Sequence, residues 1–173
     1  FGLLTDSSLL RGYIFYERNE VWFDSAQVLY GVHAPEILGI FRIETNFGKR
    51  NGHRPAINAL FTLYQTSKWK RFARGELTSL LFLCSINNLD PFDIPGSWAG
   101  AFGLCQFIPT SYFLFAVDGD HDGDIDLFSE PDAILSVANY LRIHGYSESE
   151  KSRIRAVKSY NPGDKQYPKA VMQ

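Results

Sequence analysis

Apolar residues recur at three- and four-residue intervals along most of this chain, and the alternating pattern of a half-buried strand is scarce. The run from Thr5 to Ser8 supplies helix-capping residues, and Gly31 stands where a helix commonly ends. Between them the spacing predicts an amphipathic helix that continues to Tyr30. Its apolar positions are Leu10, Ile14, Val21, Trp22, Val28 and Tyr30.

The rest of the chain gives the same signal. Pro35 predicts a second helix, because the first turn of a helix has no use for the missing N–H, and Gly48 is expected to end it. Further helices are predicted over residues 56–65, 69–87, 103–115, 132–144 and 148–160. A length of 173 residues fits one domain, residues 1–173. We therefore expect a mainly α fold, a single helical bundle with irregular loops.

Composition excludes several classes of protein. Hydrophobic residues make up 45% and charged residues 21% of the chain, which is ordinary for a globular protein and excludes disorder and fibrous repeats. No apolar run reaches the ~18 residues of a membrane span. Cys84 and Cys105 lack a metal-binding spacing, so we expect two buried thiols, with a disulfide left open. The chain starts at Phe1 without a Met, which is compatible with a removed export signal.

Glu44 is the one carboxylate in an unusual place. It follows Ile37, Ile40 and Phe41 by seven, four and three residues, so on a helix it shares their apolar face. A partly desolvated carboxyl has a raised pKa and can act as a general acid. The alternative is a glutamate at the edge of the core, paired with Arg42 or with Lys49.

A glycine-rich segment, residues 96–103 (GSWAGAFG), predicts a close approach of the backbone to another element, with Ser97, Trp98 and Phe102 left to line it. Gln106 follows among apolar residues. A buried amide without a partner costs free energy, so Gln106 is expected to bind backbone or a polar ligand.

With these residues in view, the chain resembles the lytic transglycosylases of the membrane-bound lytic transglycosylase B type, glycoside hydrolase family 103. Residues 31–48 (GVHAPEILGIFRIETNFG) look like the segment around the family's catalytic glutamate. Further motifs match in the family's order over residues 58–63, 96–103, 106–111, 136–141, 144–146 and 156–161. The resemblance implies a lysozyme-like domain of the goose-type lysozyme and soluble lytic transglycosylase kind.

The resemblance also implies an activity, cleavage of the β-1,4 bond between N-acetylmuramic acid and N-acetylglucosamine in peptidoglycan. Glu44 would act alone, first as acid and then as base, to give 1,6-anhydro-muramyl products. The implied sugar-binding residues are Ser97, Trp98, Phe102, Gln106, Tyr160, Asn161 and Tyr167. The expected partners are peptidoglycan strands rather than nucleic acid, and we expect a monomer in the periplasm or secreted.

Three departures from the family pattern bear on the sugar sites. Phe102 stands where the family usually has Met, and Cys105 where it has a small residue. A large segment that longer members insert between Gly145 and Tyr160 is missing, which indicates a reduced catalytic core.

Residues 118–132 hold seven acids and no Lys or Arg, whereas the remainder holds 17 basic residues against 12 acids. The spacing of Asp118, Asp120 and Asp122, with Gly123 at position 6 and the backbone carbonyl of Asp124 at position 7, fits the first half of an EF-hand loop. Position 12 is Ser129 rather than Glu. The resemblance implies a lengthened loop with its last ligand at Asp132, and Glu130 is a nearby competitor. We expect structural Ca²⁺, with a solvated acidic loop as the alternative.

Two other functions remain open. A hydrolytic muramidase, acting on ordinary or de-N-acetylated glycan, needs a second carboxylate, and Asp90 and Asp93 are the candidates. A non-catalytic peptidoglycan-binding module could use the same groove, although it would have no need of a buried acid.

Overall fold

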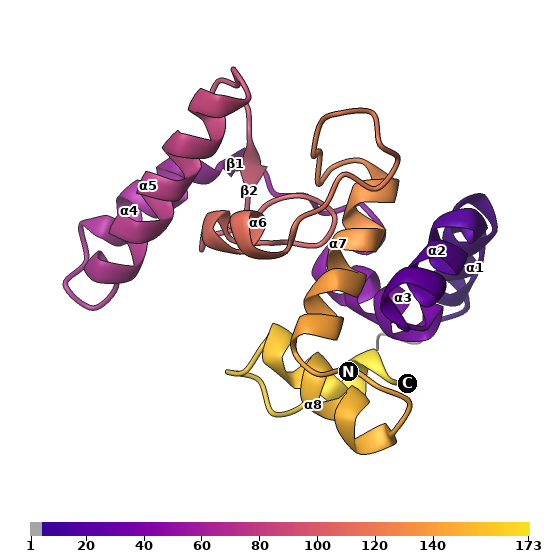
Figure 1. Ribbon diagram of the computed structural model, residues 1–173. Coiled ribbons are helices and arrows are strands. Elements are labelled where there is room, and N and C mark those ends of the chain that lie inside the picture. The colour runs from indigo at the N-terminus through magenta and orange to yellow at the C-terminus, as the bar shows by residue number, and fades with distance from the viewer. Residues whose placement is uncertain (1–4) are drawn as a thin grey trace.

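The structure is a computed structural model that describes residues 5–173, and most of the described chain is helical (Figure 1). In chain order, the elements are α1 (Asp6–Arg18), α2 (Glu20–Tyr30), α3 (Ala34–Glu44), β1 (Arg54–Pro55), α4 (Ala56–Tyr64), α5 (Lys70–Ile86), β2 (Pro95–Gly96), α6 (Pro109–Phe115), α7 (Glu130–Ile143), α8 (Glu150–Tyr160) and α9 (Tyr167–Val171). The prediction of a mainly α fold is confirmed. Among the described residues, no helix is both long and apolar enough to cross a membrane.

Helix α7 is the centre of the fold. Residues 132–138 are all buried, so this helix is covered on every side rather than along one stripe. Helices α2, α3, α6 and α8 contact it (Figure 1). Ile134, Val137 and Leu141 are fully buried there and join one continuous cluster of core residues.

The first predicted helix is two helices, because Asn19 breaks it. The Asn19 side chain is buried and donates hydrogen bonds to the Phe15 carbonyl (2.9 Å) and to Glu130 Oε2 (2.7 Å). An asparagine that bonds backbone in this way competes with the helical hydrogen-bond pattern. The break therefore ties the α1–α2 junction to the start of α7.

The apolar face predicted for α1 and α2 is only partly the buried one, because Trp22 and Tyr30 pack against the core while its aliphatic positions do not. Leu10, Ile14 and Val28 are exposed, and the core receives Phe15 and Phe23 instead. Aromatic side chains bury more area than aliphatic ones, which favours the face that carries them.

Helix α3 begins at Ala34 with Pro35 in its first turn, as predicted, but it ends at Glu44 rather than Gly48. The Thr45 hydroxyl donates to the Leu104 carbonyl (3.0 Å) and accepts from the Gly48 N–H (3.1 Å). Asn46 and Phe47 follow with φ of 52° and 58°, in the left-handed region that stops a helix. The tight turn leaves Glu44 as the last helical residue.

The predicted helix over residues 103–115 is restricted to α6. The backbones of Phe102 and Phe107 exchange two hydrogen bonds (2.9 and 3.1 Å), which closes a turn over the residues between them. Gly103 and Gln106 adopt φ of 76° and 52° in that turn, so it cannot be helical. The helix starts only at Pro109.

Helices α4 and α5 form an antiparallel arm that leans away from the rest of the molecule (Figure 1). At its base, β1 pairs antiparallel with β2, with Arg54 opposite Gly96. Helix α5 also packs on α6. At the far end of the chain, α9, which the sequence did not predict, packs on α3 and α8.

Candidate active site

Glu44 lies where α3 meets the turn that follows, half-buried. Burial raises the pKa of its carboxyl, and a hydrogen bond from Tyr167 lowers it in part, so the net pKa is above the ordinary value. Neither Arg42 nor Lys49 forms an ion pair with it among the described residues. Arg42 donates instead to the Ala170 carbonyl (2.5 Å). The carboxyl is therefore a desolvated acid rather than half of a salt bridge.

Two stacked tyrosines cover Glu44 from the C-terminal side. The Tyr167 hydroxyl donates to Glu44 Oε1 at 2.5 Å. The Tyr160 ring lies parallel to that of Tyr167, within 4°, and its hydroxyl donates to the Cys105 carbonyl at 2.7 Å. Burial raises the pKa of both phenols well above their ordinary value, so both remain donors. The hydrogen bond from Tyr167 holds the carboxyl in place, and the Tyr160 ring stacks on Tyr167.

A groove of about 800 Å³ opens beside Glu44. Its described lining residues are Glu44, Arg50, Gly52, His53, Arg54, Asn58, Ala59, Thr62, Leu63, Gly96, Ser97, Trp98 and Gln106. Glu44 is the one carboxylate among them. The groove therefore holds a single candidate acid facing basic, amide and hydroxyl groups.

The glycines of residues 96–103 allow the close approach that their spacing predicts. A Cβ at Gly96 would lie 2.8 Å from that of Ala56, and one at Gly100 would lie 2.4 Å from Leu60. A Cβ at Gly103 would lie 2.5 Å from that of Leu127. The segment is thereby pressed between α4 and the loop before α7, and it forms one wall of the groove.

Ser97 and Gln106 lie on that wall with their polar groups set by the loop. Ser97 Oγ accepts from the N–H groups of Ala99 (3.3 Å) and Ala101 (3.2 Å), so its own proton is left for another acceptor. Gln106 Nε2 donates to the Gly103 carbonyl at 2.9 Å. These bonds hold one polar atom of each side chain in place, and the wall can bond a polar ligand.

The structure does not bring all the predicted sugar-binding residues to the groove. Phe102 is buried and packs on Tyr112 and Phe128, so its ring forms the wall of a second cavity of about 520 Å³. Asn161 is exposed at the end of α8 and lies outside the groove lining. Tyr167 bonds Glu44 and Tyr160 stacks on Tyr167, but neither is among the described residues that line the groove.

The two candidates for a second carboxylate lie elsewhere. Asp90 and Asp93 line the second cavity, together with Asp124 and Asp126, and not the groove beside Glu44. The geometry that an ordinary two-carboxylate glycosidase requires is therefore not formed by these residues.

Sequence reasoning missed the basic wall of the groove. Arg50, His53 and Arg54 line it, in the segment between α3 and α4 that runs into β1. Three basic residues within five positions could have indicated a binding site from the sequence. A cluster of charges in a loop, however, most often only faces solvent. Their place opposite β2 depends on the two-residue pairing of β1 with β2.

Cys84 and Cys105 are buried free thiols, as expected. Burial raises the pKa of both, so neither is a reactive thiolate.

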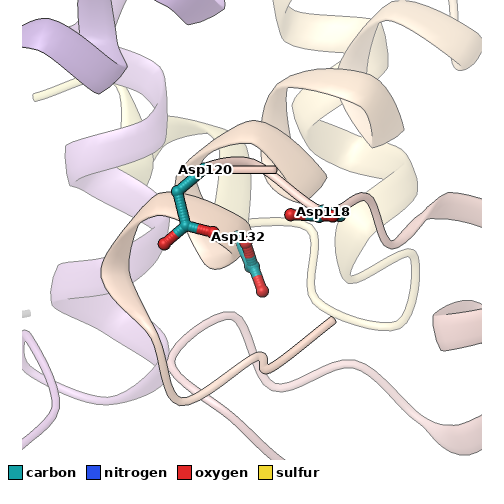
Figure 2. A group of neighbouring side chains, drawn as sticks. All are labelled: Asp118, Asp120 and Asp132. Carbon is teal, nitrogen blue, oxygen red and sulfur yellow. The ribbon is translucent and has the colours of Figure 1, made fainter. Parts of the chain in front are cut away.

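The acidic loop brings three carboxylates together. Asp118 and Asp120 from its start and Asp132 from the first turn of α7 each offer an oxygen within 4.8 Å of the others (Figure 2). Asp132 is buried, accepts from the N–H groups of Gly119 (2.7 Å) and Asp126 (2.6 Å), and has a pKa that burial raises. The Asp132 carboxylate thus links two separate positions of the loop through hydrogen bonds.

The other acids of the loop have different partners. Asp122 Oδ1 accepts from the Asp124 N–H (2.9 Å), and both residues are exposed outside the group of three. Glu130 is turned away and bonds Arg18 and Asn19. Asp132 therefore takes the place beside Asp118 for which Glu130 was the competitor.

These residues fit a hard divalent cation. Asp118 Oδ1 is buried and has no hydrogen-bond partner among residues 5–173, so it is available to bind a cation. Carboxylate and backbone oxygens are the ligands that Ca²⁺ prefers.

A mainly helical domain with one half-buried glutamate at the edge of a groove has the architecture of a lysozyme-like domain. The comparison with protein families identifies which family of such domains the chain belongs to. Residues 2–170 match the family described as "Transglycosylase SLT domain", and the chain belongs to this family.

Individual relatives agree with the family. The chain is 35% identical over 154 residues to membrane-bound lytic murein transglycosylase B of Escherichia coli K12, covering 88% of this chain and 43% of the relative. The E. coli lytic transglycosylase SLT35, solved in complex with calcium, matches with a TM-score of 0.95 and 26% identity over 99% of this chain and 74% of its own. This similarity confirms the predicted fold class.

A third relative was solved with a glycan fragment. SltB3 of Pseudomonas aeruginosa, in complex with NAG-anhNAM-pentapeptide, matches with a TM-score of 0.79 and 32% identity over 84% of this chain and 39% of its own. This chain spans less than half the length of SltB3 and of the curated E. coli relative.

Proposed function

We propose that this chain is a peptidoglycan lytic transglycosylase that cleaves the β-1,4 bond between N-acetylmuramic acid and N-acetylglucosamine. The observation that carries the proposal is the solitary Glu44 in the groove, with Asp90 and Asp93 in a separate cavity. An intramolecular reaction needs no enzyme nucleophile and no second carboxylate to activate water. One residue that first gives and then accepts a proton is enough.

In the proposed reaction, the protonated Glu44 carboxyl donates its proton to the glycosidic oxygen as the bond from that oxygen to the anomeric carbon breaks. The resulting carboxylate accepts the proton of the muramic acid 6-hydroxyl, whose oxygen bonds the anomeric carbon. The products are a free 4-hydroxyl on N-acetylglucosamine and a 1,6-anhydro ring, and Glu44 ends protonated as it began. Burial of the carboxyl supports this cycle, because it raises the pKa and favours the protonated starting state.

The neighbouring groups have separate roles in this proposal. Ser97, Trp98 and Gln106 line the groove and would hold the sugars, while Tyr167 would orient Glu44 through its hydrogen bond. Tyr160 would support Tyr167 by stacking, and Asn161 borders the same end of α8. Phe102 would not contact the sugar; its buried ring would hold the glycine-rich wall of the groove in position.

We also propose that Asp118, Asp120 and Asp132 bind structural Ca²⁺, with Asp122 and the backbone carbonyl of Asp124 completing the ligand set. The cation would offset charge in the loop and supply no catalytic chemistry. We propose that the chain works as a monomer, and a peptidoglycan substrate would place its activity in the periplasm or outside the cell.

Product mass analysis of digested peptidoglycan tests the proposal. Anhydro-muramyl ends are expected, at a mass one water below that of a reducing end. Reducing ends would establish a hydrolytic muramidase, and an absence of products would indicate a binding module. Glu44→Gln protein prepared in parallel shows whether any product depends on this residue.

A further inference from the structure

Two tryptophans form an exposed aromatic corner beside the groove. Trp98 follows β2 on the groove wall and is 71% exposed, while Trp69 precedes α5 and is 37% exposed. Their rings meet edge to face, with centroids 6.4 Å apart at 75°. Because Trp69 is not among the residues that line the groove beside Glu44, its ring extends the aromatic surface beyond that groove.

The Trp69 ring is held in place although it is exposed. Phe72, one helical turn on, packs its edge against Trp69 with centroids 6.1 Å apart at 71°. The backbone N–H of Trp69 donates to the Thr66 carbonyl (3.2 Å), which fixes the backbone at the turn between α4 and α5. An ordered aromatic surface loses little conformational entropy when a ligand covers it.

The chemistry of this corner suits a sugar. One face of a pyranose ring presents C–H groups that pack on an aromatic ring, while its hydroxyl and acetamido groups need hydrogen-bond partners. Within residues 5–173, neither indole N–H donates a hydrogen bond to the protein, so each ring has a polar group left for such a partner. Trp98 is largely exposed and Trp69 partly so, with Lys68 Nζ lying over the Trp69 ring at 5.1 Å from its centroid. Exposure of the apolar area that remains costs free energy that a bound ligand would recover.

We propose that Trp69 provides an additional sugar-binding position, next to the one at Trp98, so that the protein binds longer glycan strands more tightly than a single disaccharide. This inference rests on the proposed function, because the same groove must hold the strand. Trp69 would set the preferred strand length and would take no part in the bond cleavage at Glu44.

The test measures binding in Glu44→Gln protein, which should not consume the ligand. The probes are the GlcNAc–MurNAc disaccharide and a hexasaccharide of three such repeats, prepared from peptidoglycan trimmed of its peptides and titrated by calorimetry. Adding Trp69→Ala should weaken hexasaccharide binding about tenfold, in line with the loss of one aromatic contact, and change disaccharide binding less than about twofold. Trp69→Phe should restore most of the loss, because it keeps an aromatic face.

Phe82→Ala is the matched control, since Phe82 is an exposed aromatic residue of α5, the helix that Trp69 precedes, and it contacts Phe113 rather than the groove. It should change neither affinity. An equal loss for both sugars with Trp69→Ala, or no loss for the hexasaccharide, overturns the inference. If the wild-type protein still yields anhydro products in that case, the proposed function stands without it. If the protein with Trp69 intact binds neither sugar and forms no products, both proposals fail.

Discussion

The hydroxyl of Tyr167 and the carboxyl of Glu44 are joined by a hydrogen bond of 2.5 Å across 123 residues of sequence. The two effects on the carboxyl oppose each other, because burial raises the pKa of Glu44 and this bond lowers it. Burial is the larger effect. The bond therefore orients the acid while limiting how far its pKa rises.

Tyr167→Phe should move the pH profile. Without the donor, the pKa of Glu44 rises further, and since the protonated acid starts the reaction, the alkaline limb of the activity profile shifts to higher pH. The measurement is the initial rate of product release from pH 4 to 9. Tyr160→Phe is the control, because its hydroxyl bonds the Cys105 carbonyl and not Glu44. Equal profiles for wild type and Tyr167→Phe would show that the bond does not tune the acid.

Glu44→Gln should lower activity by a factor of about 10²–10⁴ or more, because it removes the transferable proton while keeping the size of the side chain. If Glu44→Gln protein releases product at the wild-type rate, another residue carries out the proton transfer.

The same variant should change the dependence of stability on pH. The folded-state pKa of Glu44 is raised above its unfolded value, so its contribution to stability is fully present at low pH and is lost as the pH rises through the folded pKa. The melting temperature of Glu44→Gln should therefore match that of the wild type near pH 4 and exceed it at pH 8. Exposed Glu17→Gln is the control and should follow the wild type. A variant that is less stable than wild type at pH 8 would contradict this.

Removing Ca²⁺ should destabilise the fold. Binding to the folded state alone contributes RT ln(1 + [L]/Kd), about 2.7 kcal/mol at a hundredfold excess over Kd, which corresponds to about 5–10 °C in melting temperature. Chelator should lower the melting temperature, and Ca²⁺ should restore it better than Mg²⁺, which dehydrates reluctantly.

Asp120→Asn should abolish most of that response, since Asp120 belongs to the group of three carboxylates and bonds no backbone group of the loop among the described residues. Asp93→Asn, an exposed acid of the neighbouring cavity, should leave it intact. Identical melting curves with chelator and with Ca²⁺ would reduce the segment to an acidic turn.

Two glycine substitutions should change the free energy of unfolding in opposite directions. Gly103 has φ of 76°, and an added Cβ would lie 2.5 Å from that of Leu127, so Gly103→Ala should destabilise the protein by about 2 kcal/mol or more. Gly75 lies inside α5 with nothing within 4 Å of an added Cβ, so Gly75→Ala should stabilise by ~0.5–1 kcal/mol. Denaturant unfolding of the two variants checks both values, and a neutral Gly103→Ala would show that the wall of the groove can shift.

The sequence predicted those parts of the site that depend on local spacing. Pro35 marked the start of α3, and the spacing from Ile37 placed Glu44 near the core. The break at Asn19 was missed, because it depends on a bond to Glu130, which lies 111 residues away. Helix α9 was missed because five residues carry too little periodic signal.

The sequence also did not predict which side chains line the groove. Phe102 was expected to face the sugars because its neighbours do, but the turn that it closes with Phe107 directs its ring toward Tyr112. The tertiary pairing of β1 with β2, and not the sequence around each residue, brings Arg54 to the same groove as Trp98.

The contact between Tyr167 and Glu44 has a consequence for the order in which the protein is made. Residue 44 leaves the ribosome long before residue 167, and the carbonyl of Ala170, which holds Arg42 of the same helix, emerges later still. A partly synthesised chain can form α3, but it lacks the tyrosine that orients the acid. The site proposed to cleave peptidoglycan is therefore assembled only when the chain has been made nearly to residue 170.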